Sequence, residues 1–138
     1  MTRSAQPLLG NRRGAAMIES ALAMLVLGIL IAGIMEIGLT GMISSCVAFA
    51  AQRAARYASV RGSGSGHPAA LADIQATAQS YASPLSPGAL TVTVAWTPNN
   101  NPGSTVLVTV SYSIKPAMLP LDNGILKLQS SARQTITQ

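Results

Sequence analysis

Two carboxylates, Glu19 and Glu36, lie inside the most apolar part of this sequence. A lone carboxylate in hydrocarbon costs several kcal/mol unless it is protonated, reaches an interface or meets a cation. No Lys or Arg stands between Arg13 and Arg53, so the neighbouring sequence offers neither carboxylate a cation. The chemistry open to Glu19 is therefore ion pairing with a group from elsewhere, with a protonated or interface-seeking carboxylate as the alternative.

The sequence holds no recognisable catalytic set. His67 is the only histidine and lies in a Gly/Ser segment, and Cys46 is the only cysteine, which rules out an internal disulfide. No carboxylate pair has metal-binding or acid–base spacing, and no glycine motif for phosphate is present. We expect no enzymatic activity, no bound metal and no cofactor.

The element that positions both glutamates is a long apolar helix. Only 9% of the 138 residues are charged, against roughly one-quarter in soluble domains. The uncharged stretch 20–35, extended by 37–43, exceeds the about 20 residues that cross a bilayer. We expect a transmembrane segment over about 17–41, inside a helix over 15–61 that is on the order of 70 Å long.

The orientation of this span follows from the flanking charges. Basic residues lie on both sides, but the N-terminal cluster, which contains Arg12 and Arg13, lies closer to the span. This favours a cytoplasmic N-terminus and a single-pass protein of the cytoplasmic (inner) membrane, with the C-terminal domain outside the cytoplasm.

Small residues mark two sets of packing positions on the predicted helix. Gly28 and Gly33 would allow close approach between helices in lipid, although ordinary membrane-helix glycine is an equal alternative. A second set recurs at spacings of three and four and predicts a narrow stripe that faces a partner: Ala48, Ala51, Ala55 and Ala58. Gln52, Arg53 and Arg56 would turn away from that partner.

The C-terminal part predicts a small domain over 69–138, after a flexible Gly/Ser linker over 62–68. Pro68 is expected in the first turn of a short helix. One face of that helix would carry four larger or apolar residues: Leu71, Ile74, Ala78 and Tyr81.

Period-two alternation predicts strands in the remainder of the domain. It runs through "LTVTVAWT" and "TVLVTVSYSIK", which are joined by a seven-residue turn segment, "PNNNPGS". The run "ILKLQSSARQTIT" would add a third strand, and residues 115–124 leave open whether there is a fourth.

The expected class is α+β: a long N-terminal transmembrane helix, a short second helix and an antiparallel sheet of about three strands. The sheet's apolar face must be covered by the short helix, the alanine stripe or both.

Two alternative interpretations fail on the pattern. "AFAA" at 48–51 is typical of a signal-peptidase site, and "ISSC" at 43–46 is typical of a lipoprotein box. Both lie about 30 residues or more beyond Arg13, which is too far for the 7 to 15 apolar residues of an export signal.

The net charge of +5 arises from having only four acidic residues, and the basic residues are scattered. We therefore expect no nucleic-acid partner.

Several of these motifs together resemble a known family. "RGAAMIESALAMLVLGIL" is similar to the class III signal of type IV pilins, in which a basic leader ends in glycine and glutamate is the fifth residue of the mature helix. "IMEIG" and "AAQRAARYASVRG" resemble the TadE-like minor pilins, or pseudopilins, of tight-adherence (Flp) pilus systems. The resemblance covers about residues 12–62.

The resemblance implies a function in pilus assembly. A prepilin peptidase would remove the leader 1–14 by cutting between Gly14 and Ala15. The new amine of Ala15 would then pair with Glu19 of the same or a neighbouring subunit. Glu36 would lie at the outer interface or in an assembly contact. The other implied partners are pilin or pseudopilin subunits and the pilus assembly machinery, with incorporation into an extracellular pilus.

The sequence also departs from the family pattern. Ala15 stands where larger pilins often have phenylalanine, and Ser20 stands where the abundant pilin of this system often has an aromatic residue. The second departure favours a minor subunit. Two alternatives stay open: an uncleaved, membrane-anchored scaffold or binding domain, and a type II secretion pseudopilin.

Overall fold

The chain forms an α+β structure in the computed structural model, which describes residues 11–115 and 126–138. The elements of these residues are, in order, α1 (Asn11–Ser59), α2 (Leu71–Tyr81), the 3-10 turn η1 (Pro87–Ala89), β1 (Leu90–Thr97), β2 (Thr105–Ile114) and β3 (Leu126–Thr135). They fall into two compact units, one up to Ile37 and one from Gly38 onward. The predicted fold class is confirmed. The possible fourth strand within 115–124 lies almost wholly outside the described residues.

The long helix α1 runs for 49 residues, from Asn11 to Ser59. No proline interrupts it, and its many Ala, Leu and Met residues are strong helix formers. It starts four residues before the predicted Ala15, so helix continues through Gly14. At the other end Val60 donates a backbone hydrogen bond to Arg56 and Arg61 donates one to Ala58, which tightens the chain before Gly62.

The three strands form one antiparallel sheet in the order β1-β2-β3. The register places Val94 opposite Val108, and Val108 opposite Ala132. Because side chains alternate along each strand, these residues share one face, as the period-two pattern predicts. The other face is rich in Ser and Thr, and a 2.9 Å hydrogen bond joins the hydroxyls of Thr109 and Ser131 across it.

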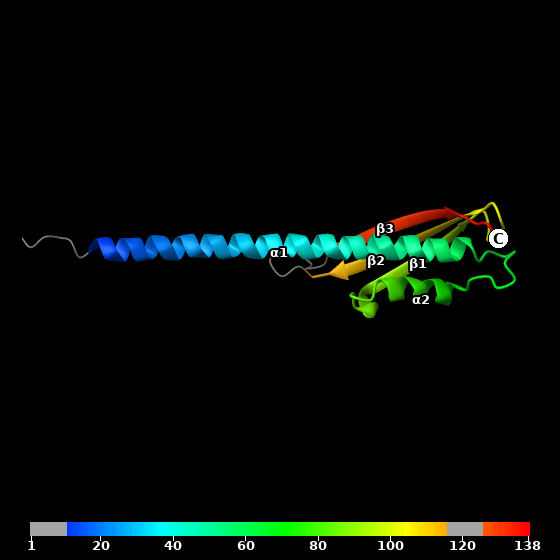
Figure 1. Ribbon diagram of the computed structural model, residues 1–138, viewed down its shortest axis with the longest axis horizontal. Helices are drawn as coiled ribbons and strands as arrows, with labels where there is room; N and C mark the ends of the chain where they lie inside the picture. Colours follow the sequence, from blue (N-terminus) through cyan, green and yellow to red (C-terminus); the bar gives the residue numbers. More distant parts are fainter. Residues whose placement is uncertain (1–10, 116–125) are drawn as a thin grey trace, which may run out of the picture. The chain divides into compact units, whose positions relative to one another are not determined.

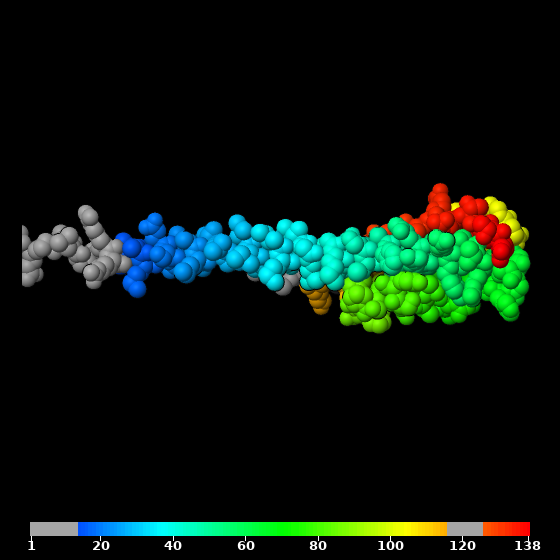
Figure 2. All heavy atoms as spheres, in the orientation of Figure 1, coloured from blue at the N-terminus to red at the C-terminus, as the bar shows by residue number. Residues whose placement is uncertain are grey.

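Both helices cover the apolar face of the sheet. Figure 1 draws α2 alongside the second half of α1, and the two share one core with β2. That core includes the buried valines of β2, namely Val106, Val108 and Val110. The space-filling view shows the green residues of α2 in close contact with the cyan-green part of α1 (Figure 2). The sequence left open whether one helix or both would cover the sheet, and both do.

The short helix α2 differs from its prediction in two details. It begins at Leu71, so Pro68 lies before the helix and not in its first turn. Residues 68–70 are held outside the helix because Ala69 donates a hydrogen bond to the Arg61 carbonyl and is itself buried. Of the predicted inner face only Ile74 and Ala78 are buried.

Replacing Ile74 by alanine is expected to destabilise the Gly38–Gln138 unit by about 2–4 kcal/mol, because Ile74 is fully buried and the change leaves a cavity. Leu71→Ala is the matched control: Leu71 lies one turn earlier and is 54% exposed, so its loss should be small. Thermal denaturation of the full chain in detergent, followed by the fluorescence of the only tryptophan, Trp96, measures both. Equal losses in the two variants would contradict this packing.

The segment over 62–68, expected to be a flexible linker, is tied to other parts of the chain. The Ser63 amide donates to the Asn100 carbonyl at 2.9 Å, and the Ser63 hydroxyl donates to Asn101 Oδ1 at 2.8 Å. A Cβ at Gly62 would collide with the Gln138 carbonyl oxygen and the Ile136 side chain. Glycine is therefore required at this close approach.

Candidate functional site: the two halves of the long helix

The first half of α1 presents apolar side chains to its surroundings. Ile18 is 73% exposed, Leu22 63% and Ile37 75%, and the other large apolar residues of this half are similar. Among the described residues one helix is long and apolar enough to cross a membrane, within Gly14–Ser59, and its most apolar window is 0% buried. Such exposure is unfavourable in water, and this half of α1 is long and apolar enough that it could span a membrane.

The start of this half brings together the predicted cleavage and assembly residues. Gly14, Ala15 and Glu19 are all exposed and helical. Ala15 and Glu19 are four residues apart, which places them on one helix face. Glu19 makes no hydrogen bond or ion pair with any residue that the structure describes. Beside it, the Ser20 hydroxyl donates to the Ala16 carbonyl at 2.9 Å, so that polar group is satisfied within the helix.

Glu36 and the two packing glycines have different surroundings. Glu36 is only partly exposed and, like Thr40, has an interaction partner in the structure. A Cβ added at Gly28 or Gly33 would meet nothing within 4 Å. The chain itself therefore does not need these two glycines for close approach, and their predicted role between helices stays a prediction.

The second half of α1 carries the alanine stripe, which packs on the chain's own sheet. Ala51, Ala55 and Ala58 are 0% exposed, as are Ala50 and Ala54. The stripe is wider than predicted: Val47 is 1% exposed, while Ala48 is only partly buried. Methyl side chains keep the helix close to the valines of β2, which explains why alanine recurs here. Gln52, Arg53 and Arg56 are exposed, as the spacing predicted.

The rest of the "AAQRAARYASVRG" segment also has a packing role. Arg61 Nη1 donates to the Tyr57 hydroxyl at 2.7 Å, and the Arg61 guanidinium lies 4.5 Å from the Tyr57 ring centroid. Ser59 accepts a 2.9 Å backbone hydrogen bond from Thr137, which fastens the helix end to the segment after β3. Most of this segment is therefore accounted for by docking of the helix on the sheet.

One cluster on the outer surface was not predicted. The Arg53 guanidinium lies 4.8 Å from the Phe49 ring centroid and 5.6 Å from that of Tyr81, and the two rings meet edge to face at 5.7 Å. We call these three residues the Arg53 cluster. No sequence pattern predicts it, because the spacing of Tyr81 in α2 indicates a buried position, whereas Tyr81 is 44% exposed.

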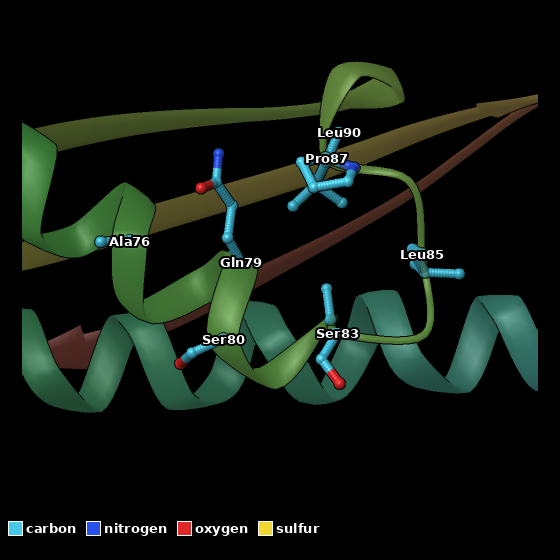
Figure 3. Close-up of a pocket in the computed structure, with 8 residues that line it drawn as sticks. Ala76, Gln79, Ser80, Ser83, Leu85, Pro87 and Leu90 are labelled. Carbon is cyan, nitrogen blue, oxygen red and sulfur yellow. The ribbon is translucent and has the colours of Figure 1, made fainter.

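A hollow of about 410 Å³ opens at the end of α2. Figure 3 shows its lining residues, which come from α2, the following turn, η1 and the first residue of β1, with the Gln79 amide and the hydroxyls of Ser80 and Ser83 as polar groups. The full lining is Ala76, Gln79, Ser80, Ala82, Ser83, Leu85, Pro87 and Leu90. None of these residues is ionisable, and the described residues hold no group of three His, Cys, Asp or Glu side chains that could bind a metal. The hollow therefore offers shape but no acid, base or nucleophile.

Comparisons with known proteins identify no relative. No protein-family model matches the sequence, and neither a curated protein nor a solved structure matches it. The function must therefore be argued from the two halves of α1 and from the sequence motifs themselves.

Proposed function

We propose that this chain is a minor pilin or pseudopilin of a tight-adherence pilus system, a structural and assembly subunit that a prepilin peptidase processes after Gly14. One observation carries the proposal. An exposed apolar helical half begins beside Gly14 and Ala15, and the one carboxylate near that beginning, Glu19, has no partner among the described residues.

Processing would supply the missing cation. Cutting the bond between Gly14 and Ala15 creates an amine at Ala15, on the same helix face as Glu19. In hydrocarbon an unpaired carboxylate costs several kcal/mol, so a subunit is driven toward any site that neutralises it. The amine of Ala15, in the same or a neighbouring subunit, would provide that site and would favour transfer from the bilayer into a bundle of like helices.

The competing function is an uncleaved scaffold anchored by the same helix. The observation that favours it is that α1 passes through Gly14 without a break. The scaffold would keep residues 1–14 and would leave Glu19 without the Ala15 amine. The two functions therefore differ in one covalent bond.

Replacing Glu19 by alanine tests the proposal. The variant is expected to insert into membranes as well as wild type but to lose most of its co-purification with the other pilus subunits, because the paired carboxylate is gone. Ser20→Ala is the matched control: it removes the adjacent polar group, whose hydroxyl is satisfied by Ala16. Unchanged co-purification of Glu19→Ala after detergent extraction would contradict the pairing.

A further inference from the structure

The Arg53 cluster presents an exposed guanidinium that lies against two aromatic rings and has free hydrogen-bonding capacity. Cation–π contacts to Phe49 and Tyr81 hold Arg53 from two different helices. Its side chain donates no hydrogen bond to any residue in the described ranges, although a guanidinium has five N–H donors. A planar donor group held between rings is suited to bidentate recognition of a carboxylate.

We propose that the Arg53 cluster is a docking site for an acidic segment of a different protein, with a partner carboxylate bound to the Arg53 guanidinium. Arg56 lies one turn further along the exposed side of α1 and adds a second positive charge. Exposed aromatic rings beside an arginine are typical of the residues that dominate protein interfaces. The proposal goes beyond pilus assembly and does not depend on the cut after Gly14.

Charge complementarity identifies the occupant as a different protein. From Gly38 to Gln138 the sequence has six Lys and Arg residues but only two acidic side chains, Asp73 and Asp122. Asp73 is already engaged, since its Oδ2 accepts a 3.3 Å hydrogen bond from the Ala70 amide at the start of α2. A second copy of this unit therefore offers little negative charge to Arg53, whereas an acidic partner matches it.

The position of Arg53 argues against a lipid headgroup. The span predicted from the sequence ends at about residue 41, and Ile43 is already packed in the core at 8% exposed, so we place the end of the hydrocarbon layer at about Met42. Arg53 lies eleven residues after Met42, about 16 Å of helix at about 1.5 Å per residue. The headgroup layer on each side of a bilayer is only about 5–8 Å thick. Arg53 thus lies beyond it, where a protein partner can reach the cluster.

The test uses the full chain in phosphatidylcholine nanodiscs. The probe is a capped, fluorescein-labelled peptide of alternating glutamate and serine, and its binding is followed by fluorescence anisotropy at low ionic strength. The same peptide with glutamine in place of glutamate is expected not to bind. Arg53→Ala is expected to weaken binding about tenfold or more, because it removes charge-assisted hydrogen bonds.

Variants of the cluster separate geometry from charge. Arg53→Lys is expected to weaken binding although the charge is kept, because lysine lacks the planar fork. Phe49→Leu is expected to weaken binding about threefold, because it removes one ring but keeps apolar bulk. Arg133→Ala, which removes an equal charge from β3, is the matched control and should change Kd by less than about twofold. Circular dichroism of each variant establishes that the fold is retained.

Several outcomes would overturn the proposal. Binding by Arg53→Lys equal to wild type, or an equal loss in Arg133→Ala, would show unspecific charge attraction. Displacement of the peptide by an equal concentration of glycerophosphoglycerol, the soluble headgroup of an anionic lipid, would assign the cluster to a membrane surface. Self-association of the wild type that disappears in Arg53→Ala would assign it to a second copy of the chain.

Discussion

Replacing Ala55 by aspartate is expected to prevent the Gly38–Gln138 unit from folding. Ala55 is 0% exposed in the middle of the alanine stripe, against the valines of β2. The change adds volume to a filled site and buries a carboxylate without a partner. Together these effects cost on the order of 5 kcal/mol. That is comparable with the whole stability of a small domain, about 5–15 kcal/mol.

The control for Ala55→Asp is Gln52→Asp, which places the same side chain on the exposed side of α1. Trypsin digestion of the full chain in detergent distinguishes the outcomes, because Lys127 and Arg133 lie in β3 and are protected only while the sheet is folded. We expect rapid cleavage in Ala55→Asp and wild-type resistance in Gln52→Asp. Equal resistance in both variants would mean that the stripe does not hold α1 on the sheet.

Replacing Gly14 by valine is expected to abolish removal of the leader. Gly14 lies in the first turns of α1, and glycine lowers the stability of a helix by about 1 kcal/mol relative to alanine. Glycine therefore makes it easier for the helix to open at the proposed cleavage site. Valine adds a branched side chain at the scissile bond and hinders access to its carbonyl carbon.

The matched control for Gly14→Val is Gly28→Val in the same helix, where an added Cβ also meets nothing within 4 Å. Co-expression with the cognate prepilin peptidase, followed by gel mobility, is expected to show full-length Gly14→Val and shortened Gly28→Val. Processing of Gly14→Val at the wild-type rate would contradict the proposed cleavage site.

The sheet and the docking half of α1 could be predicted from sequence because their periods are simple. Alternation puts Val92, Val94 and Trp96 on one side of β1, and the burial along that strand follows it. Likewise a spacing of three and four puts Ala51 and Ala55 on one helix side, whichever element covers them. Such patterns depend only on the local backbone geometry of a strand or a helix.

Features that depend on distant contacts could not be predicted. Tyr81 fits the apolar face of α2 by spacing, but it turns toward Phe49 and Arg53 on α1. Gly62 and Ser63 have the composition of a linker, yet contacts with Asn100 and Gln138 hold them in place. Neither contact leaves a period in the sequence, because each joins residues at least 28 positions apart.

The structure explains one of the two sequence motifs by packing within the chain and leaves the other without such an explanation. Most of "AAQRAARYASVRG" is explained by packing on the sheet, so it supports the fold more directly than it supports a pilus function. The motif of Gly14, Ala15 and Glu19 has no such explanation within the chain, because these residues are exposed and Glu19 has no partner among the described residues. The functional proposal therefore depends on this short segment.

The most direct test is the intact mass and N-terminal sequence of the wild-type chain purified from membranes, with and without the cognate prepilin peptidase. We predict a new N-terminus at Ala15 that appears only with the peptidase, which would give Glu19 its amine. An intact Met1 under both conditions would contradict the pilin pathway and favour the anchored scaffold, and a start at Cys46 or Ala51 would contradict the membrane-spanning helix itself.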